Sequence, residues 1–261
     1  MRSLSIGATG MLAQQLNVEV ISNNIANLNT TGFKRQRAEF TDLLYQNLRR
    51  VGTNSSDTGT IVPTGIQLGL GVKPTATYRI TGQGAMQITD NSLDVAINGE
   101  GYFNVELPSG ETGYTRAGAF QLSPTGDIVT PDGYTVQPGI NVPTNAVSVS
   151  INASGEVYIK LDGQVNTALA GQFDLATFPN EAGLEAIGDN YFLETPASGA
   201  ATTGSAGSTG FGSILQGALE SSNVNAVSEI TNLITAQRAY EMNSKIITAS
   251  DEMMRSVTNI R

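Results

Sequence analysis

Two long segments, one at each end of the chain, carry apolar side chains at the seven-residue spacing of packed helices. In the N-terminal segment one such row is apolar throughout, and a second row three residues on mixes apolar with small and polar side chains. This spacing predicts a helix with a coiled-coil-like seam. An ordinary amphipathic helix packed on its own domain would show a similar pattern. The two rows are Leu4, Met11, Val18 and Ile25, and Gly7, Gln14, Ile21 and Leu28.

The C-terminal segment repeats this pattern. Residues 221–261 contain no Gly or Pro, so nothing in their sequence interrupts a helix. Ser221 or Ser222 is the expected N-terminal cap, because a short side-chain oxygen accepts hydrogen bonds from the free amides of the first turn. The row at seven-residue spacing is Leu233, Tyr240, Ile247 and Met254.

Between these segments the chain changes to short alternating strands. From about residue 72 to 195, Gly- and Pro-containing turns recur at intervals of about ten residues, as at 98–99, 124–127, 131–133 and 153–155. This punctuation is typical of antiparallel hairpins and predicts an all-β domain.

The segments together predict an α+β fold, in which the N- and C-terminal helices pair as a coiled coil and an all-β central domain is inserted between them. The joins are polar and rich in Gly, Ser and Thr, a composition that predicts no regular structure. We expect an N-terminal helix and signature at 1–45, an extended segment at 46–71, a β-rich domain at 72–196, a Gly/Ser/Thr-rich linker at 197–212 and a C-terminal helix at 213–261.

Both helices carry more apolar side chains than one mutual seam covers. We therefore expect neighbouring copies of the same protein to cover the remainder, since a helix gains its stability from packing an apolar face. The side chains outside the seam are Leu12, Leu16 and Val20 in the first helix, and Val227, Ile230 and Ile234 in the second.

The first helical segment is also unusually rich in Asn, which is a mediocre helix former. Packed among identical helices, such amides would bridge laterally and fix the register, as a buried Asn does in a coiled coil. The alternative is that each amide is simply solvated. Gly32, after Thr30 and Thr31, is expected to end the helix as a left-handed cap. The amides belong to Asn17, Asn23, Asn24, Asn27 and Asn29.

Composition narrows the chemistry. The chain has no Cys, His or Trp, which excludes disulfides, Cys or His zinc sites, His-dependent nucleophilic triads and His or Cys haem ligation. Residues 51–220 carry four basic and sixteen acidic groups, which argues against nucleic acid as a partner. Polar residues interrupt the first twenty residues, so we expect no cleaved signal peptide, and no stretch reaches the length of a membrane span.

Enzymatic interpretations are weak. The Gly-rich pairs at 82–84 and 99–101 lack the full spacing of a nucleotide loop and are better explained as hairpin turns. Asp90, Asp94 and Glu100 offer a carboxylate pair of the glycosidase type, but solvated strand and turn positions are the simpler explanation. We expect no catalytic residues, no cofactor and no metal.

Three stretches resemble the bacterial flagellar rod and hook family. They are ISNNIANLNTTGFKRQRAEFTDLLYQ, LDVAINGEGYFNVELPSGETGYTRAGAFQLSPTGDIVTPDGYTVQP and ESSNVNAVSEITNLITAQRAYEMNSKIITASDEMM. The likeness covers nearly the whole chain and is strongest to the distal rod branch, because residues 46–63 resemble a segment that typical hook proteins lack. The signature positions of the resemblance are Asn23, Asn24, Asn27, Gly32, Phe33 and Lys34.

The resemblance implies a structural subunit that self-assembles into the straight tubular distal rod and transmits torque to the hook. It implies helices lining an inner tube, outward β domains, and a rod-specific segment that stiffens contacts between subunits. It also implies proximal rod and hook subunits, outer ring bushing proteins and the flagellar export apparatus as partners, and a location from the periplasm to the outer membrane. The alternatives are a hook or proximal rod subunit, or, outside the family, an adhesin-like β domain on a stalk.

Overall fold

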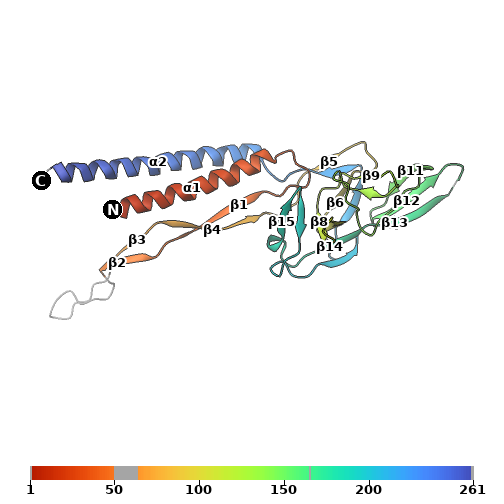
Figure 1. The fold of residues 1–261 in the computed structure, drawn as a ribbon, viewed down its shortest axis with the longest axis horizontal. Coiled ribbons are helices and arrows are strands. Elements are labelled where there is room, and N and C mark those ends of the chain that lie inside the picture. The colour runs from red at the N-terminus through yellow and green to blue at the C-terminus, as the bar shows by residue number, and fades with distance from the viewer. Residues whose placement is uncertain (1, 50–63, 165, 260–261) are drawn as a thin grey trace. The chain divides into compact units, whose positions relative to one another are not determined.

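The computed structural model describes residues 2–49, 64–164 and 166–259, and the chain divides into two compact units (Figure 1). Unit 1 comprises Met1–Ile25, Gln36–Tyr78 and Asn225–Arg261, and unit 2 comprises Ala26–Arg35 and Arg79–Val224. The expected α+β fold is confirmed, with a helix near each end of the chain and a central β-rich region. No described helix is both long and apolar enough to cross a membrane.

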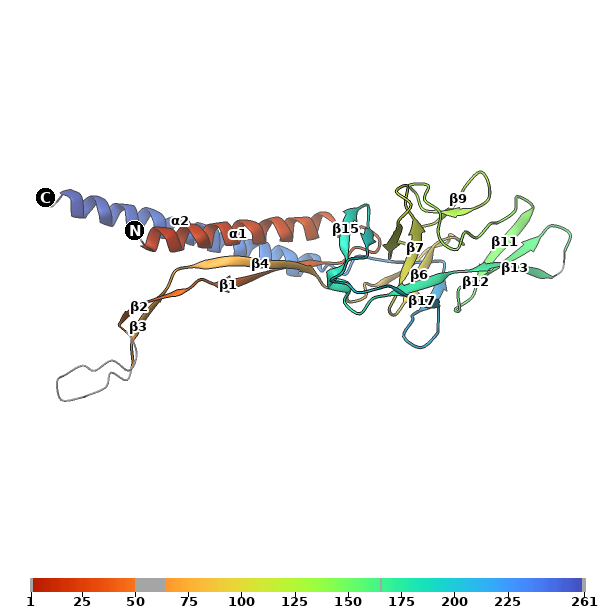
Figure 2. The same cartoon turned by 60° about the horizontal axis from the view of Figure 1, so that its bottom comes forward.

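In unit 1 the helices α1 (Arg2–Ala26) and α2 (Ala226–Asn259) lie side by side and run antiparallel (Figures 1 and 2). The contacts that set this direction run from Gly7 at one end to Asn24 at the other. Gly10 contacts Asn243, and the side-chain amide of Asn24 donates to Glu229 Oε2 at 3.1 Å. A Cβ on Gly7 would lie only 2.9 Å from Cγ1 of Ile247, so this glycine lets the helices approach closely.

A β ribbon packs along α1 in the same unit. Strand β1 (Gln36–Asp42) pairs with β4 (Val72–Arg79), and β2 (Tyr45–Arg49) pairs antiparallel with β3 (Ile66–Gly69). The backbone N of Val72 lies 3.5 Å from Thr9 Oγ1 of α1, and β4 runs beside α1 in Figure 2. Residues 72–78, expected to open the β domain, therefore belong to unit 1. The segment expected at 46–71 is paired strand at its two flanks, and its residues 50–63 lie outside the described residues.

Unit 2 is the β domain. Its largest described sheet has the strand order β15-β16-β8-β7-β14-β17, and a smaller one has the order β11-β12-β13. An aromatic core joins them, in which the ring of Phe103 lies edge-on to Phe120 and Phe173, with centroids 5.1 and 6.0 Å away. The bounds are β5 (Met86–Ile88), β6 (Val95–Asn98), β7 (Tyr102–Glu106), β8 (Thr112–Thr115), β9 (Gln121–Leu122), β10 (Ile128–Val129), β11 (Ala146–Ile151), β12 (Glu156–Leu161), β13 (Thr167–Gln172), β14 (Asp174–Thr177), a short 3-10 helix (Glu181–Gly183), β15 (Glu185–Gly188), β16 (Tyr191–Leu193), β17 (Thr202–Ser205), β18 (Ser213–Gln216) and β19 (Ala218–Glu220).

Two of the turns predicted from the sequence close antiparallel hairpins. Residues 124–127 connect β9 to β10, and residues 153–155 connect β11 to β12. Gly126 adopts a φ of +92° with its Cα against the carbonyl of Val142, a position that a side chain would not fit. Glycine at such positions is the feature by which the sequence predicts these hairpin turns.

Two expected boundaries are wrong. The stretch 197–212 is not an irregular linker, because it contains β17, which pairs with β14 at the edge of the larger sheet. The stretch 213–261 is not all helix, because β18 pairs with β6 and β19 pairs with β5 before α2 begins at Ala226. Neither Ser221 nor Ser222 caps α2, because they precede its first residue, Ala226, by five and four positions. Asn225 caps it instead, since its Oδ1 accepts the N–H of Ser228 at 3.1 Å.

The end of α1 also differs from expectation. The helix stops at Ala26, so Leu28 lies in the following turn and not in a helical seam. Gly32 has the expected positive φ of +69°, but six residues beyond the helix. There its N–H donates to the carbonyl of Glu220 at 2.8 Å. Gly32 thus serves a long-range contact within unit 2 and not a helix cap.

Candidate assembly surface

The face that α2 turns inward is made of small and polar residues. Glu229, Ala236 and Ser250 are buried and Asn243 is half-buried, at a spacing of seven residues. The apolar row predicted to form the seam lies beside this face and is less covered. Leu233 and Ile247 are half-buried, whereas Tyr240 and Met254 stay 43% and 39% exposed. Sequence reasoning missed the polar row because it searched the spacing only for apolar side chains.

Helix α1 is covered on two sides. Ala13, Val20, Ile21 and Asn24 are buried, so Val20, expected to lie outside the seam and to be covered by neighbouring copies, is covered within the chain. The other predicted seam residues of α1, which are Leu4, Met11, Val18 and Ile25, are half-buried, as is Leu28 beyond its end. The β ribbon accounts for this extra burial, because it occupies a side of α1 that α2 does not.

A large apolar surface remains uncovered on the helices. Val227 is 75% exposed, and Ile230 and Ile234 continue the same face at helical spacing. Leu12 on α1 is 65% exposed. Contiguous exposed apolar surface of this kind marks an interaction site. Of the six side chains expected to lie outside the seam, these four are exposed, whereas Leu16 is half-buried and Val20 is buried within the chain. Further exposed apolar side chains on α2 are Met242, Ile246 and Met253.

Asn24 explains part of the Asn richness of the first helix. It is buried, and its amide pairs with the backbone of Gln36 through two hydrogen bonds of 2.8 Å, Nδ2 to the carbonyl and N–H to Oδ1. Its Nδ2 also donates to Glu229 of α2. One side chain thereby joins α1, β1 and α2. Asn27 has a local role, since its Oδ1 accepts from Thr30 Oγ1 at 3.1 Å. Asn23 and Asn29 are exposed and Asn17 is half-buried.

The last signature residue, Lys34, is part of a buried ion cluster in unit 2. Its Nζ lies 2.6 Å from Glu220 Oε1, and Nη1 of Arg116 lies 3.2 Å from Glu220 Oε2. The carboxylate also accepts the N–H of Gly84 at 2.8 Å, and Nζ donates to the carbonyl of Gly82 at 3.1 Å. Burial lowers the pKa of Lys34, against the opposing effect of Glu220. We call Lys34, Arg116 and Glu220 the ion cluster.

The comparisons with known proteins match both chain ends and the centre. Residues 4–34 match the family model of flagella basal body rod proteins, residues 96–159 that of the flagellar hook protein FlgE/F/G D1 domain, and residues 215–260 that of the flagellar basal body rod FlgEFG protein C-terminal region. Over all of both chains, the sequence is 61% identical to the flagellar basal-body rod protein FlgG of Caulobacter vibrioides. The chain belongs to the flagellar basal-body rod protein family.

More distant relatives carry the same name. The FlgG protein of Agrobacterium fabrum is 53% identical over 99% of this chain and 98% of its own. That of Bacillus subtilis is 42% identical over 100% of this chain and 99% of its own. The first matched segment contains α1 and ends at Lys34, and the third begins in β18 and contains Glu220 and α2. The ion cluster therefore joins the two matched terminal segments.

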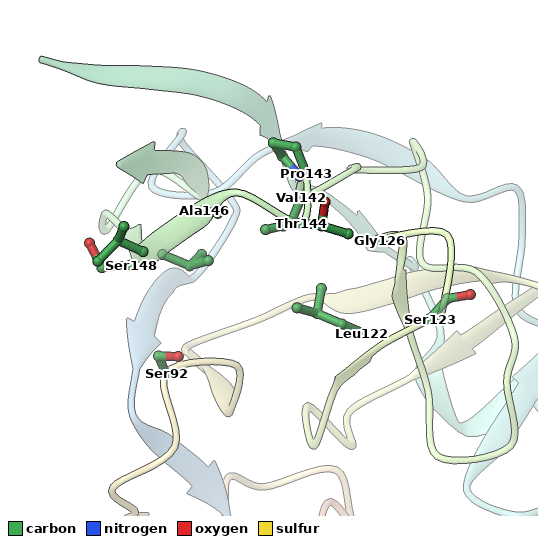
Figure 3. Close-up of a pocket in the computed structure, with 11 residues that line it drawn as sticks. Ser92, Leu122, Ser123, Gly126, Val142, Pro143, Thr144, Ala146 and Ser148 are labelled. Atoms are coloured by element: carbon green, nitrogen blue, oxygen red, sulfur yellow. The ribbon is translucent and has the colours of Figure 1, made fainter. Parts of the chain in front are cut away.

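Rod proteins of this family are structural, so membership confirms that the chain is not an enzyme. Buried Asp94 accepts hydrogen bonds from Thr89 and Asn91 at 2.7 and 2.8 Å, whereas Asp90 and Glu100 are exposed. A groove of about 240 Å³ beside β11 is lined by apolar and small residues with Ser92, Ser123, Thr144 and Ser148, and by no acid or base (Figure 3). In the described residues no group of His, Cys, Asp and Glu could hold a metal ion.

Proposed function

We propose that this chain is the subunit of the straight tubular distal rod, the drive shaft that passes torque to the hook. Copies join through α1 and α2, which pair as a coiled coil and line the tube, while the β domain faces outward. Torque passes from copy to copy through packed side chains, so the function requires no active site. The observation that carries the proposal is the uncovered apolar face of α2 at Val227, Ile230 and Ile234.

The signature and seam residues have separate roles in this proposal. Seam positions such as Leu233, Tyr240 and Met254 contact neighbouring helices, and Asn23 and Asn29 are placed to bridge between copies. Asn24 and Lys34 act within the chain, where they hold the surfaces in shape. Leu48 and Ile66, exposed on the β2–β3 ribbon, support a second contact between copies next to the rod-specific segment.

The partners follow from the same role. We infer that the polymer joins proximal rod subunits at one end and the hook at the other, and turns within the outer ring bushing proteins between periplasm and outer membrane. The subunit reaches this place through the flagellar export apparatus.

A hook or proximal rod subunit is the second candidate. The family model matched by residues 96–159 is shared by FlgE, FlgF and FlgG, and therefore does not separate rod from hook. Polymer shape distinguishes them, because a rod is straight and a hook is curved and bendable. Electron microscopy of the assembled chain is therefore expected to show straight tubes, and curved filaments would favour the hook.

Ile230→Asp tests the assembly surface itself. Ile230 is 49% exposed, so the change leaves the single chain folded, but a charge buried between copies costs several kcal/mol at every subunit. Sedimentation should show polymer for the wild type and none for this variant. Ile88→Asp is the matched control, since Ile88 is 83% exposed on β5 of unit 2. Normal polymer from Ile230→Asp would refute the proposal.

A further inference from the structure

An open groove of about 490 Å³ runs where α1 and α2 lie side by side. Its apolar part is half-buried Val18 together with the partly exposed ring of Tyr240. Val18 and Tyr240 belong to the two apolar rows that were expected to pack against each other, yet the groove between them is open. Two carboxylates and two amides complete the lining, from Gln15 and Glu19 on α1 and Gln237 and Glu241 on α2.

Among the described residues, the two carboxylates of the groove have no cationic partner. Glu19 Oε1 accepts a hydrogen bond from Gln15 Nε2 at 3.1 Å, which orients it. In the part of the chain that the structure describes, neither Glu19 nor Glu241 makes an ion pair. An apolar wall that ends in two acidic groups suits a long basic side chain, whose stem packs on the apolar wall while its head meets the carboxylates. A guanidinium suits it best, because it also stacks on a tyrosine ring.

Arg238 offers this chemistry on the same helix. It lies about 200° around the helix axis from Tyr240, and its side chain is not among those that line the groove of its own chain. It is exposed and makes no ion pair among the described residues, although Glu241 is only three positions away. The groove and Arg238 are different parts of the chain, so a contact between them in neighbouring copies is head-to-tail, and such a contact builds a filament when its rotation does not close into a ring.

We propose that the groove of Val18, Glu19, Tyr240 and Glu241 receives the Arg238 side chain of a neighbouring copy. The guanidinium pairs with the two carboxylates and lies against the tyrosine ring. This inference rests on the proposed self-assembly and names the contact that gives it direction. The charge pair fixes which face of one α2 meets which groove of the next, a register that apolar contacts alone leave loose.

Mixing two charge-reversal variants tests the contact. Glu19→Arg alone and Arg238→Glu alone each place like charges together, and each should raise the critical concentration for assembly at least about tenfold. In an equal mixture the two variants can alternate. The groove of the Glu19→Arg variant then receives the new carboxylate of the Arg238→Glu variant, and the unchanged groove of the Arg238→Glu variant receives the unchanged Arg238 of the other. The mixture should assemble within about threefold of the wild-type critical concentration. A rescue by mixing cannot arise from an effect inside one chain.

Lys245→Glu is the matched control. Lys245 is exposed, carries the same charge and lies seven residues further along the same face of α2. A mixture of Lys245→Glu with Glu19→Arg should not assemble at the wild-type critical concentration. If this mixture assembles and the mixture of Arg238→Glu with Glu19→Arg does not, the assignment of Arg238 is overturned. Glu19 and Arg238 are both exposed, so the milder changes Glu19→Gln and Arg238→Gln should leave the circular dichroism of the dilute chain unchanged. Each of these two variants should also raise the critical concentration for assembly.

The outcomes separate the two proposals. Single variants that assemble like the wild type, or a mixture that fails to assemble, would overturn the groove contact and leave rod assembly intact. A wild-type chain that never assembles would overturn both.

Discussion

Replacing Glu220 with Gln is expected to destabilise unit 2 far more than any exposed charge change. Glu220 is 1% exposed, and its carboxylate balances two buried cations, Lys34 and Arg116, at 2.6 and 3.2 Å. Gln keeps the size and one acceptor oxygen but removes the negative charge, which leaves both cations buried without compensation. Loss of one partner from a buried ion pair costs about 3–5 kcal/mol, and we expect the free energy of unfolding to fall by that amount.

The assay is urea unfolding of the dilute chain, followed by tyrosine fluorescence. The chain has no Trp, and five of its eight Tyr lie in unit 2, among them Tyr102, whose ring centroid is 5.5 Å from Arg116 Cζ, so the signal reports mainly on this unit. Asp251→Asn is the matched control. It breaks the pair of Asp251 with Arg255, whose side chains are 53% and 77% exposed, and should change stability by less than about 1 kcal/mol.

A double variant gives a stricter test. Lys34→Met together with Glu220→Gln removes one cation along with the anion, so the two losses should be less than additive by about 1 kcal/mol or more. The reasoning fails if Glu220→Gln lies within about 0.5 kcal/mol of the wild type, or if the two single losses simply add.

Further predictions concern single positions in the two units. Gly32→Ala should lower the free energy of unfolding by more than about 2 kcal/mol, because its Cβ would lie 2.9 Å from two backbone atoms at a φ of +69°. Gly110→Ala, at a φ of +84° in open space, should lower it by about 1 kcal/mol, and equal losses for the two variants would exclude the clash. Asn24→Ala should lower the free energy of unfolding, followed by helical circular dichroism on heating, by about 1–3 kcal/mol, whereas the exposed Asn29→Ala should not. No difference between the two variants would refute the role of Asn24 in joining α1, β1 and α2. Burial raises the pKa of Tyr102, so at about pH 11 the folded chain should show less phenolate absorbance than the urea-unfolded chain, and stability from this group is lost as pH rises above about 10; equal absorbance would contradict the burial.

The parts of the fold that could be predicted are those specified by nearby residues. The hairpin turn at 153–155 places a glycine where the backbone needs a positive φ, so a short stretch is enough to recognise it. The exposed face at Val227, Ile230 and Ile234 could also be predicted, because helical spacing shows how many apolar side chains one partner helix can cover.

What could not be predicted depends on partners far along the chain. Lys34 and Glu220 are 186 residues apart, and nothing near either marks them as a pair. Strand β17 has the composition of a linker, and it is a strand because β14 offers a free edge. The inward row of α2 consists of small and polar residues because close approach to α1 and hydrogen bonds with Asn24, not apolar burial, set that face.

The most direct test of the account is amide hydrogen exchange along α2, in the dilute chain and in the assembled polymer. If copies join through the exposed helix face, the amides of residues 227–234 and 242–253, which exchange through local opening of α2, should exchange at least about a hundredfold more slowly in the polymer than in the dilute chain. Equal protection in both states would contradict the claim that these faces are where identical subunits meet.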